Sequence, residues 1–230
     1  MSELDDFYEL LNELRAQTGG PRTLEECTGS MNWPKRGVYF FFEEGEIRAD
    51  GSARTVRVGT HALGVGARST LWGRLAQHRG NVGGMLAGGG SHRGSVFRLH
   101  VGASLLRRDG DPAGIGRTWG KGSSADRITR ESEYLLEQRV SEFIGRMPFL
   151  WIGVDDEPGP LSERSLIERG AISLLSARSN PQADSASANW LGNFSDRSAI
   201  TSSGIWNVNH VDDPRQPRLL DAMARWIRQT

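Results

Sequence analysis

GVYFFFEEGEIRADGSARTVRVG, residues 37–59, decides the fold. The stretch opens with an apolar and aromatic run, continues through a polar segment that contains glycine, and closes with TVRVG (55–59). Two short apolar runs separated by a turn-forming segment are typical of a β-hairpin. We therefore expect two paired strands with a long loop between them.

A helix is expected directly after the hairpin. Ser69 or Thr70 can accept a hydrogen bond from the first turn of a helix, which the sequence continues through His78. Arg74 and His78 lie four residues apart and therefore on one face of that helix. The two polar side chains can act together.

A second pair of strand and helix completes the core. The run FLWIGV (149–154) indicates a buried strand, and a helical pattern follows from about residue 162 to 176. The order strand, strand, helix, strand, helix predicts an α+β fold with a small, mostly antiparallel three-stranded sheet flanked by helices. This core comprises residues 36–80 and 148–181.

The remaining segments are expected to surround this core within a single domain, residues 1–230. A large insertion, 81–147, begins as a glycine-rich loop and ends in a clearly amphipathic helix. Between them, residues 96–105 favour a helix, although a strand stays open. An N-terminal helix (1–20) and a C-terminal extension (182–230) with a helix near its end complete the chain.

The composition excludes several classes of protein. No segment approaches the roughly 20 consecutive apolar residues that span a bilayer. The acidic, amphipathic start of the chain does not resemble a secretion signal, so we expect a cytoplasmic protein without membrane contact. Cys27 is the only cysteine, which excludes an intrachain disulfide and a multi-cysteine zinc site. A bound metal must then have oxygen or histidine ligands, and oxygen ligands favour Mg²⁺ or Mn²⁺.

Charge is distributed unevenly although it balances overall. The chain has 28 basic and 28 acidic residues, but residues 51–108 contain no Asp or Glu, nine arginines and four of the five histidines. Such a stretch is a candidate surface for phosphate, and the alternative is that an arginine-rich composition placed these residues there by chance. The arginines expected to contact nucleic acid are Arg57, Arg68, Arg79, Arg93 and Arg98.

Several motifs resemble those of a known family, the GIY-YIG nucleases. Gly37-Val38-Tyr39 resembles the GIY element, and Arg57-Val58-Gly59 stands in the place of YIG. Arg74 lies in the following helix, where the family has its arginine, and its spacing to His78 is similar to the Arg-x-x-x-His of the restriction-endonuclease branch. Glu168 and Asn180 resemble the family's metal-binding glutamate and its trailing asparagine.

The resemblance implies a catalytic site composed of Tyr39, Arg74, His78, Glu168 and Asn180. Hydrolysis of a phosphodiester needs a deprotonated water, a counter-charge for the transition state and help for the leaving oxygen. Tyr39 is the expected general base, Arg74 the donor to phosphate oxygens, and Glu168 the ligand of one Mg²⁺ or Mn²⁺ ion. His78 is expected to relay a proton or to contact the phosphate.

Arg57 departs from the family pattern, because it replaces the second tyrosine. An arginine cannot accept a proton near neutral pH, so it cannot take over a role as base. His61, two residues beyond Gly59, is the candidate that would compensate for the missing phenol. The alternative is a weakened site.

The candidate residues also have purely structural interpretations. Ser165-Leu166-Ile167-Glu168 matches a capping box, in which the carboxylate only satisfies a backbone N–H. Tyr39 can be an ordinary core residue, Arg74 and His78 a solvated helix face, and Asn180 a turn residue before Pro181. Trp206 lies in a polar stretch able to contact bases, but we favour it as an anchor of the C-terminal tail.

Three functions are consistent with these residues. We favour an endonuclease that cuts DNA, rather than RNA, with one divalent metal ion and acts in restriction or mobile-element defence. The second function is nucleic-acid binding by a protein that kept the fold and lost the chemistry. The third is an unrelated enzyme that uses Arg74 and His78 on a small phosphorylated substrate. The sequence leaves a homodimer open.

Overall fold

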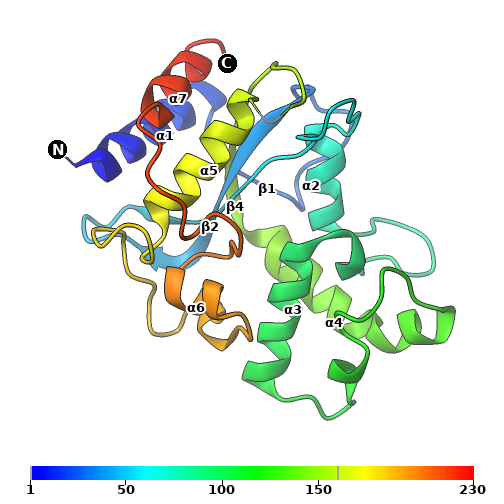
Figure 1. Cartoon of the computed structure of the whole chain (residues 1–230). Helices are drawn as coiled ribbons and strands as arrows, with labels where there is room; N and C mark the ends of the chain where they lie inside the picture. Colours follow the sequence, from blue (N-terminus) through cyan, green and yellow to red (C-terminus); the bar gives the residue numbers. More distant parts are fainter. Residues whose placement is uncertain (1, 160) are drawn as a thin grey trace.

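The computed structural model describes residues 2–159 and 161–230 as an α+β fold built on one antiparallel sheet (Figure 1). Residues 1 and 160, which belong to the predicted N-terminal helix and core, lie outside the described residues. The predicted fold class and the antiparallel character of the sheet are confirmed.

The described residues form a sheet of four strands in the order β1-β4-β2-β3. The strands are β1 Arg22–Thr23, β2 Gly37–Ile47, β3 Ala53–Gly59 and β4 Pro148–Gly153. The prediction of three strands is therefore wrong by one. β1 pairs only Arg22 with Phe149 and Thr23 with Pro148, and two residues are too few to carry the alternation that marks a strand in a sequence.

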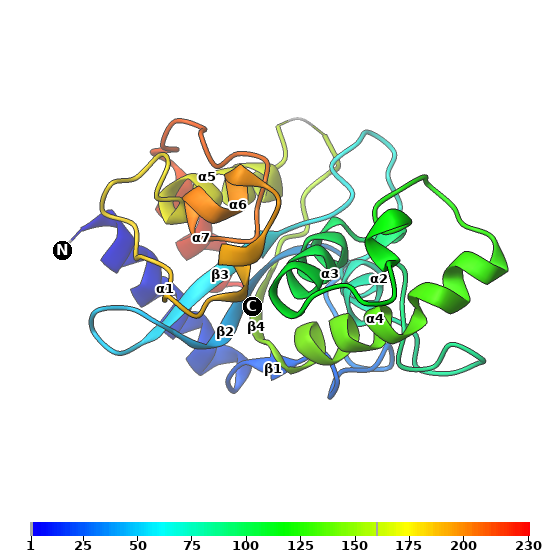
Figure 2. The same cartoon turned by 90° about the horizontal axis from the view of Figure 1, so that it is seen from below.

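Helices cover both faces of the sheet (Figures 1 and 2). One face carries α1 (Glu3–Thr18), α5 (Glu163–Leu175) and α7 (Leu219–Ile227), and the other carries α2 (Leu71–Arg79), α3 (Val96–Asp109) and α4 (Arg127–Arg146). Val38 and Phe40 of β2 belong to the first core, whereas Tyr39 and Phe41 belong to the second. A strand that is buried on both sides has a continuous apolar run, which explains GVYFFF. The short helices are η1 (His92–Gly94), η2 (Ile115–Arg117), η3 (Leu191–Phe194) and α6 (Ser198–Ser203).

Side-chain caps mark where α2 and α5 begin. Thr70 caps α2, since its hydroxyl accepts the Gly73 N–H at 3.1 Å. Ser162 caps α5 and accepts the Ser165 N–H at 3.2 Å. The alternative in which Ser165 and Glu168 form the capping box is therefore wrong. Glu168 lies inside α5, where its carboxylate is available for another role.

The C-terminal extension covers the outer edge of β3. The Trp206 N–H donates to the Val56 carbonyl at 2.7 Å, and the Asn207 side chain bonds both the N–H and the carbonyl of Val58, at 3.1 and 2.8 Å. The Trp206 ring is fully buried, and its indole N–H donates to Glu43 at 3.1 Å. The prediction that Trp206 anchors the C-terminal tail is confirmed.

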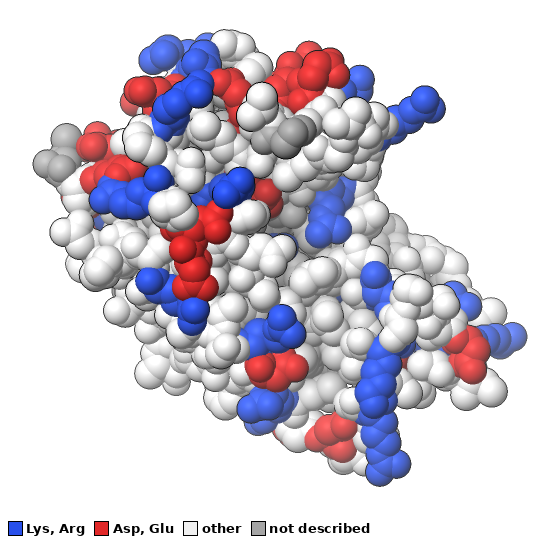
Figure 3. All heavy atoms as spheres, in the orientation of Figure 1, with Lys and Arg blue, Asp and Glu red and all other residues white. Residues whose placement is uncertain are grey.

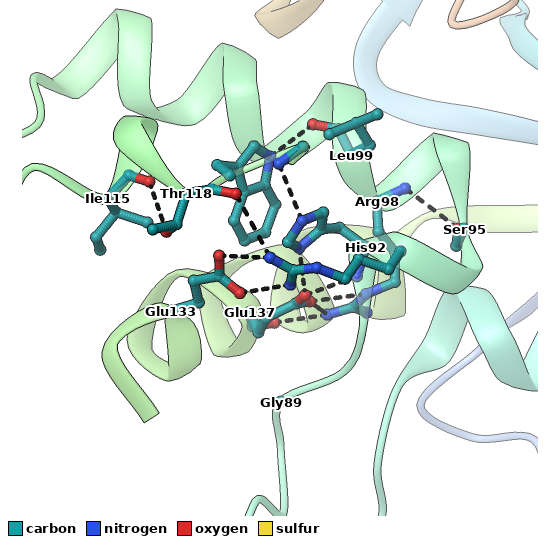
Figure 4. Close-up of polar contacts among 12 residues, drawn as sticks. Gly89, His92, Ser95, Arg98, Leu99, Ile115, Thr118, Glu133 and Glu137 are labelled. Carbon is teal, nitrogen blue, oxygen red and sulfur yellow. Dashed lines mark hydrogen bonds and ion pairs between the residues drawn. The ribbon is translucent and has the colours of Figure 1, made fainter. Parts of the chain in front are cut away.

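The insertion folds around a buried polar network between α3 and α4 (Figure 4). The Arg98 Nε donates to Glu137 at 3.0 Å, and Arg93 donates to both oxygens of Glu133 at 2.6 and 3.0 Å. His92 joins the same network, because its backbone N–H and its ring both contact Glu137. Arginines that looked unpaired along the sequence are therefore neutralised by glutamates of α4.

This network overturns two predicted contacts to nucleic acid. Arg98 is 0% exposed, and the Arg93 guanidinium is held by Glu133, so neither residue presents a free cation to phosphate. Figure 3 shows basic and acidic residues mixed on the viewed face instead of one continuous positive surface. Across the described residues, no helix is both long enough and apolar enough to span a membrane.

Candidate active site

Tyr39 of β2 and His78 of α2 form a hydrogen-bonded pair on one face of the sheet. The Tyr39 Oη and the His78 Nε2 lie 2.8 Å apart. Both residues are 0% exposed, and the rings of Phe41 and Phe97 contact the imidazole edge to face. The phenol and the imidazole can therefore exchange a proton directly, without an intervening water.

Ser95 holds the other side of the imidazole. Its Oγ lies 2.8 Å from the His78 Nδ1 and accepts the Arg98 N–H at 3.3 Å as the N-cap of α3. Arg98 also donates to the His78 carbonyl at 2.9 Å. Ser95 is not among the site residues predicted from the sequence, although a serine directly before an apolar helical run is the ordinary signal of an N-cap. The insertion thus contacts the candidate site through the start of α3.

His78 is held in its neutral form. Burial lowers the pKa of His78 well below its usual range, and the nearby Arg74 and Arg57 act in the same direction. A neutral imidazole has one nitrogen that donates and one that accepts. When Nδ1–H donates to Ser95, Nε2 accepts the hydroxyl proton of Tyr39. His78 is then placed to draw that proton away from Tyr39.

The two glycines of the motif make room for this arrangement. A Cβ on Gly59 would lie 2.3 Å from the Tyr39 Oη, so only glycine lets the phenol cross the end of β3. A Cβ on Gly37 would lie 2.4 Å from the Ile152 carbonyl oxygen, where β2 and β4 approach each other. Both glycines are therefore explained by close packing.

Arg57 lies beside Tyr39 inside the protein. Its guanidinium donates to the Trp206 carbonyl at 2.9 Å, and the residue is only 8% exposed. Burial lowers the pKa of Arg57; the nearby Tyr39 and Glu168 oppose that shift, whereas Arg74 adds to it. Arg57, predicted to contact nucleic acid, therefore lies inside the fold with its guanidinium already bonded to the protein. Its charge acts on the candidate site from within the fold.

Glu168 lies on α5, which covers the opposite face of the sheet, and its carboxylate reaches the end of β3. Its Oε1 accepts the Thr60 N–H at 3.0 Å directly after β3, and the Thr60 hydroxyl donates to the Gly37 carbonyl at 2.7 Å. Burial raises the pKa of Glu168, while the Thr60 N–H, Arg57 and His210 oppose the rise. None of the ion pairs between described residues includes this carboxylate.

Glu168 is the residue of this cluster that could hold a hard divalent ion. In proteins Mg²⁺ is held by one or two carboxylates together with water and substrate phosphate. Glu168 supplies a half-buried carboxylate that lacks an ion-pair partner among residues 2–159 and 161–230. In the part of the chain that the structure describes, no three His, Cys, Asp or Glu side chains gather as a metal site. Further ligands of such an ion would therefore be water and phosphate oxygens.

Arg74, Arg68 and Arg79 differ in what they can reach. The Arg74 Nη1 donates to Gln77 at 2.9 Å and to the Gly94 carbonyl at 3.2 Å, and the side chain is half-buried. Arg68 is exposed in the loop before α2. Arg79 donates instead to the Cys27 carbonyl. Of these three arginines, Arg74 and Arg68 are thus the ones that a phosphate can approach.

His61 is buried next to Thr60, with 6% of the residue exposed. Neither ring nitrogen has a protein partner among the described residues. Burial lowers the pKa of His61 to about 4, and Arg164, which bonds the His61 carbonyl, adds to the shift. The imidazole is therefore neutral near pH 7, but it has no hydrogen bond to Tyr39 or Glu168.

Asn180 does not join the cluster. Its side chain donates to the Leu174 carbonyl at 2.7 Å and accepts the Gln182 N–H at 3.1 Å, which closes the C-terminal end of α5. The structure therefore does not bring Asn180 together with the other predicted catalytic residues. Asn180 is the turn residue of the alternative interpretation.

Comparison with known proteins gives a family and no individual relative. The family model described as GIY-YIG domain matches residues 1–230. No curated protein and no solved structure matches the chain.

Proposed function

The chain belongs to the GIY-YIG family, and from this membership we propose that it is an endonuclease that hydrolyses phosphodiester bonds in DNA with one divalent metal ion. One observation carries the proposal beyond the family. The Tyr39–His78 pair, Arg57, Arg74 and the unpaired Glu168 carboxylate gather where β3 ends, although they come from four separate elements.

Each group has a role in the proposed reaction. The attacking water gives a proton to Tyr39 while Tyr39 passes its hydroxyl proton to Nε2 of His78. Arg74 donates to the phosphate oxygens on which negative charge develops. Glu168 would hold the divalent ion, which supplies counter-charge for the phosphate and the leaving oxygen when it is bound.

The alternative is a nucleic-acid-binding protein with weakened catalysis. It is favoured by the complete burial of Tyr39 and His78 and by Arg57 in the place of a tyrosine. An unrelated enzyme for small phosphorylated substrates is set aside, because membership of the family accounts for Arg74 and His78 together.

Incubation of the purified protein with supercoiled plasmid and linear duplex DNA tests the proposal. We expect cleavage with Mg²⁺ or Mn²⁺ and none with EDTA. Binding without cleavage in any divalent metal would favour the alternative, and neither binding nor cleavage would overturn both functions.

The proposal extends to substrate and setting. DNA is favoured over RNA, and the long insertion is proposed to help grip a substrate in restriction or mobile-element defence in the cytoplasm. The proposal leaves the oligomeric state, monomer or homodimer, open. Parallel cleavage assays on duplex DNA and duplex RNA of one sequence test the substrate, and preferential cleavage of the RNA would contradict it.

Replacing Ser95 by alanine is expected to lower the cleavage rate about tenfold and to change its pH dependence. The change removes the Oγ that fixes the His78 tautomer, so Nε2 no longer accepts from Tyr39 in every molecule. The measurement is kcat across a pH series.

Asp126→Ala is the matched control for Ser95→Ala. Asp126 is the N-cap of α4 and accepts the Thr129 N–H at 2.7 Å, but α4 presents no hydrogen bond to His78. Both changes should cost about 1 kcal/mol of stability through the lost cap, and only Ser95→Ala should affect catalysis. Equal kinetic effects would mean that Ser95 has a purely structural role.

A further inference from the structure

A hollow of about 590 Å³ lies at the end of the sheet where β2 begins and β4 ends. Three of the seven tryptophans line it, each from a different segment: Trp33 before β2, Trp151 in β4 and Trp226 in α7. All three are half-buried. We call this hollow the tryptophan groove.

The aromatic wall of the groove is fixed in position by the protein. The ring centroids of Trp33 and Trp151 lie 4.8 Å apart, and Trp72 stacks on Trp33 at 5.1 Å. The indole N–H of Trp33 donates to the Thr28 carbonyl at 2.8 Å, and that of Trp226 donates to Glu163 at 2.5 Å. With the polar atoms already bonded inside the protein, apolar ring surface is what Trp33 and Trp226 offer to a ligand.

The charge along the groove complements phosphate. Its basic lining residues are Arg22, Lys35 and Arg36, and Asp155 is the acidic side chain among them. Arg22 and Lys35 are exposed, whereas Arg36 is held by the Asp156 carbonyl and by Glu157. Rings that stack bases beside cations that contact phosphates are the combination found in proteins that bind single-stranded nucleic acid.

The groove lies at the same end of the sheet as the candidate active site. Trp151 is the register partner of Tyr39, and the strand that carries Tyr39 begins directly after Lys35 and Arg36. The Glu168 carboxylate accepts the Thr60 N–H at the end of β3, and β3 lies two strands away from β4 in the sheet. Neighbouring strands lie about 4.8 Å apart, so the two places are separated by roughly 10 Å across the sheet. A DNA strand held at Glu168 would reach the groove within a few nucleotides.

We infer that the tryptophan groove binds unpaired bases of the DNA strand whose phosphate lies at the candidate active site. This inference rests on the proposed function and names a substrate class, DNA with a single-stranded or splayed segment beside the cleavage site. Unpaired bases are required, because in a duplex the flat face of each base is covered by its neighbours. Every base has such a face, so the groove should select an unpaired strand and bind it with little dependence on its base sequence.

Binding assays in EDTA test the groove without cleavage. The probes are a fluorescein-labelled 20-nucleotide oligo-dT, a blunt hairpin duplex and the same duplex with a single-stranded extension. We expect the single strand and the extended duplex to quench tryptophan fluorescence. Trp226→Ala should weaken their binding about tenfold or more and that of the blunt duplex much less.

Variants separate stacking from charge and from loss of fold. Trp226→Phe keeps an aromatic ring and should retain most of the affinity, and Leu135→Ala, an exposed residue of α4, should behave as wild type. Lys35→Ala should reduce the slope of log K against log salt by about 0.7 for the single strand. Circular dichroism and melting temperature show that each variant is folded.

The outcomes distinguish the groove from the nuclease function. Loss of single-strand binding in folded Trp226→Ala supports the groove even when no substrate is cut. The opposite outcome is a protein that cleaves DNA while Trp226→Ala shows unchanged single-strand binding and no change in fluorescence. This result would overturn the proposal for the groove and leave the proposed nuclease function intact. A preference for the RNA form of the same oligonucleotide would overturn the assignment to DNA.

Discussion

Glu168→Gln is expected to reduce DNA cleavage by about 10³-fold or more while the protein keeps its fold and its affinity for DNA. Glutamine has the size of glutamate and still offers an oxygen to the Thr60 N–H, but it lacks the charge that a divalent ion requires. Since burial raises the pKa of Glu168, the charged carboxylate is disfavoured in the fold. The free energy of unfolding of Glu168→Gln at neutral pH should therefore equal or exceed that of the wild type.

Plasmid cleavage, DNA binding in EDTA, thermal melting and calorimetric titration with Mn²⁺ measure these effects. Glu131→Gln is the matched control, because Glu131 is an exposed glutamate of α4 whose ion pair is with Arg127, away from the candidate site and the tryptophan groove. This control should cleave at nearly the wild-type rate. Full activity of Glu168→Gln, or unfolding of that variant alone, would remove Glu168 from the metal site.

Strands buried on both faces were the most predictable part of the fold. GVYFFF and FLWIGV are apolar throughout because helices cover each side of β2 and β4, so the pattern and the environment agree. β1 was missed, because its pairing with β4 is decided by tertiary contact and not by the two residues themselves. The start of α5 was ambiguous, because Ser162 and Ser165 are both chemically able to cap it.

The motif glycines show how far local sequence can define a site. Gly59 and Gly37 were identified from the resemblance alone, and the structure adds the reason, which is contact of Gly59 with the Tyr39 ring and of Gly37 with β4. Ser95 could not be connected with His78 from the sequence, because a glycine-rich loop separates the two residues. Its role depends on how the insertion folds back onto α2.

Several arginines of residues 51–108 have acidic partners that the local sequence does not reveal. This stretch has no acidic residue of its own, yet Arg54 pairs with Glu46, Arg93 with Glu133 and Arg98 with Glu137. The partners lie before or after the stretch and reach it only in the folded chain. Burial of a cation requires such a partner, so a segment without acids is not thereby a free positive surface.

Tyr39→Phe is expected to lower the cleavage rate about 10²-fold or more, because the change removes only the hydroxyl that takes the proton from water. Phenylalanine fits the space above Gly59, so the fold should persist, although the buried His78 Nε2 loses its partner and stability falls by about 1 to 3 kcal/mol.

The competing bases are His61 and His78. Burial lowers the pKa of His61 to about 4 and that of His78 well below its usual range, so both are already neutral at higher pH.

A rise of the rate between about pH 6 and 7, which an ordinary histidine base would produce, is therefore not expected from either imidazole. His61→Ala should cleave at close to the wild-type rate, since His61 has no hydrogen bond to Tyr39 or Glu168, whereas His78→Ala should lose activity together with Tyr39→Phe. A double variant Tyr39→Phe/His78→Ala should then be little worse than Tyr39→Phe, because residues that pass one proton act as a unit. Single-turnover rates of the four proteins across a pH series measure this coupling. Near-complete activity of Tyr39→Phe, with His61→Ala or His78→Ala inactive, would show that the site relies on imidazole instead of the phenol.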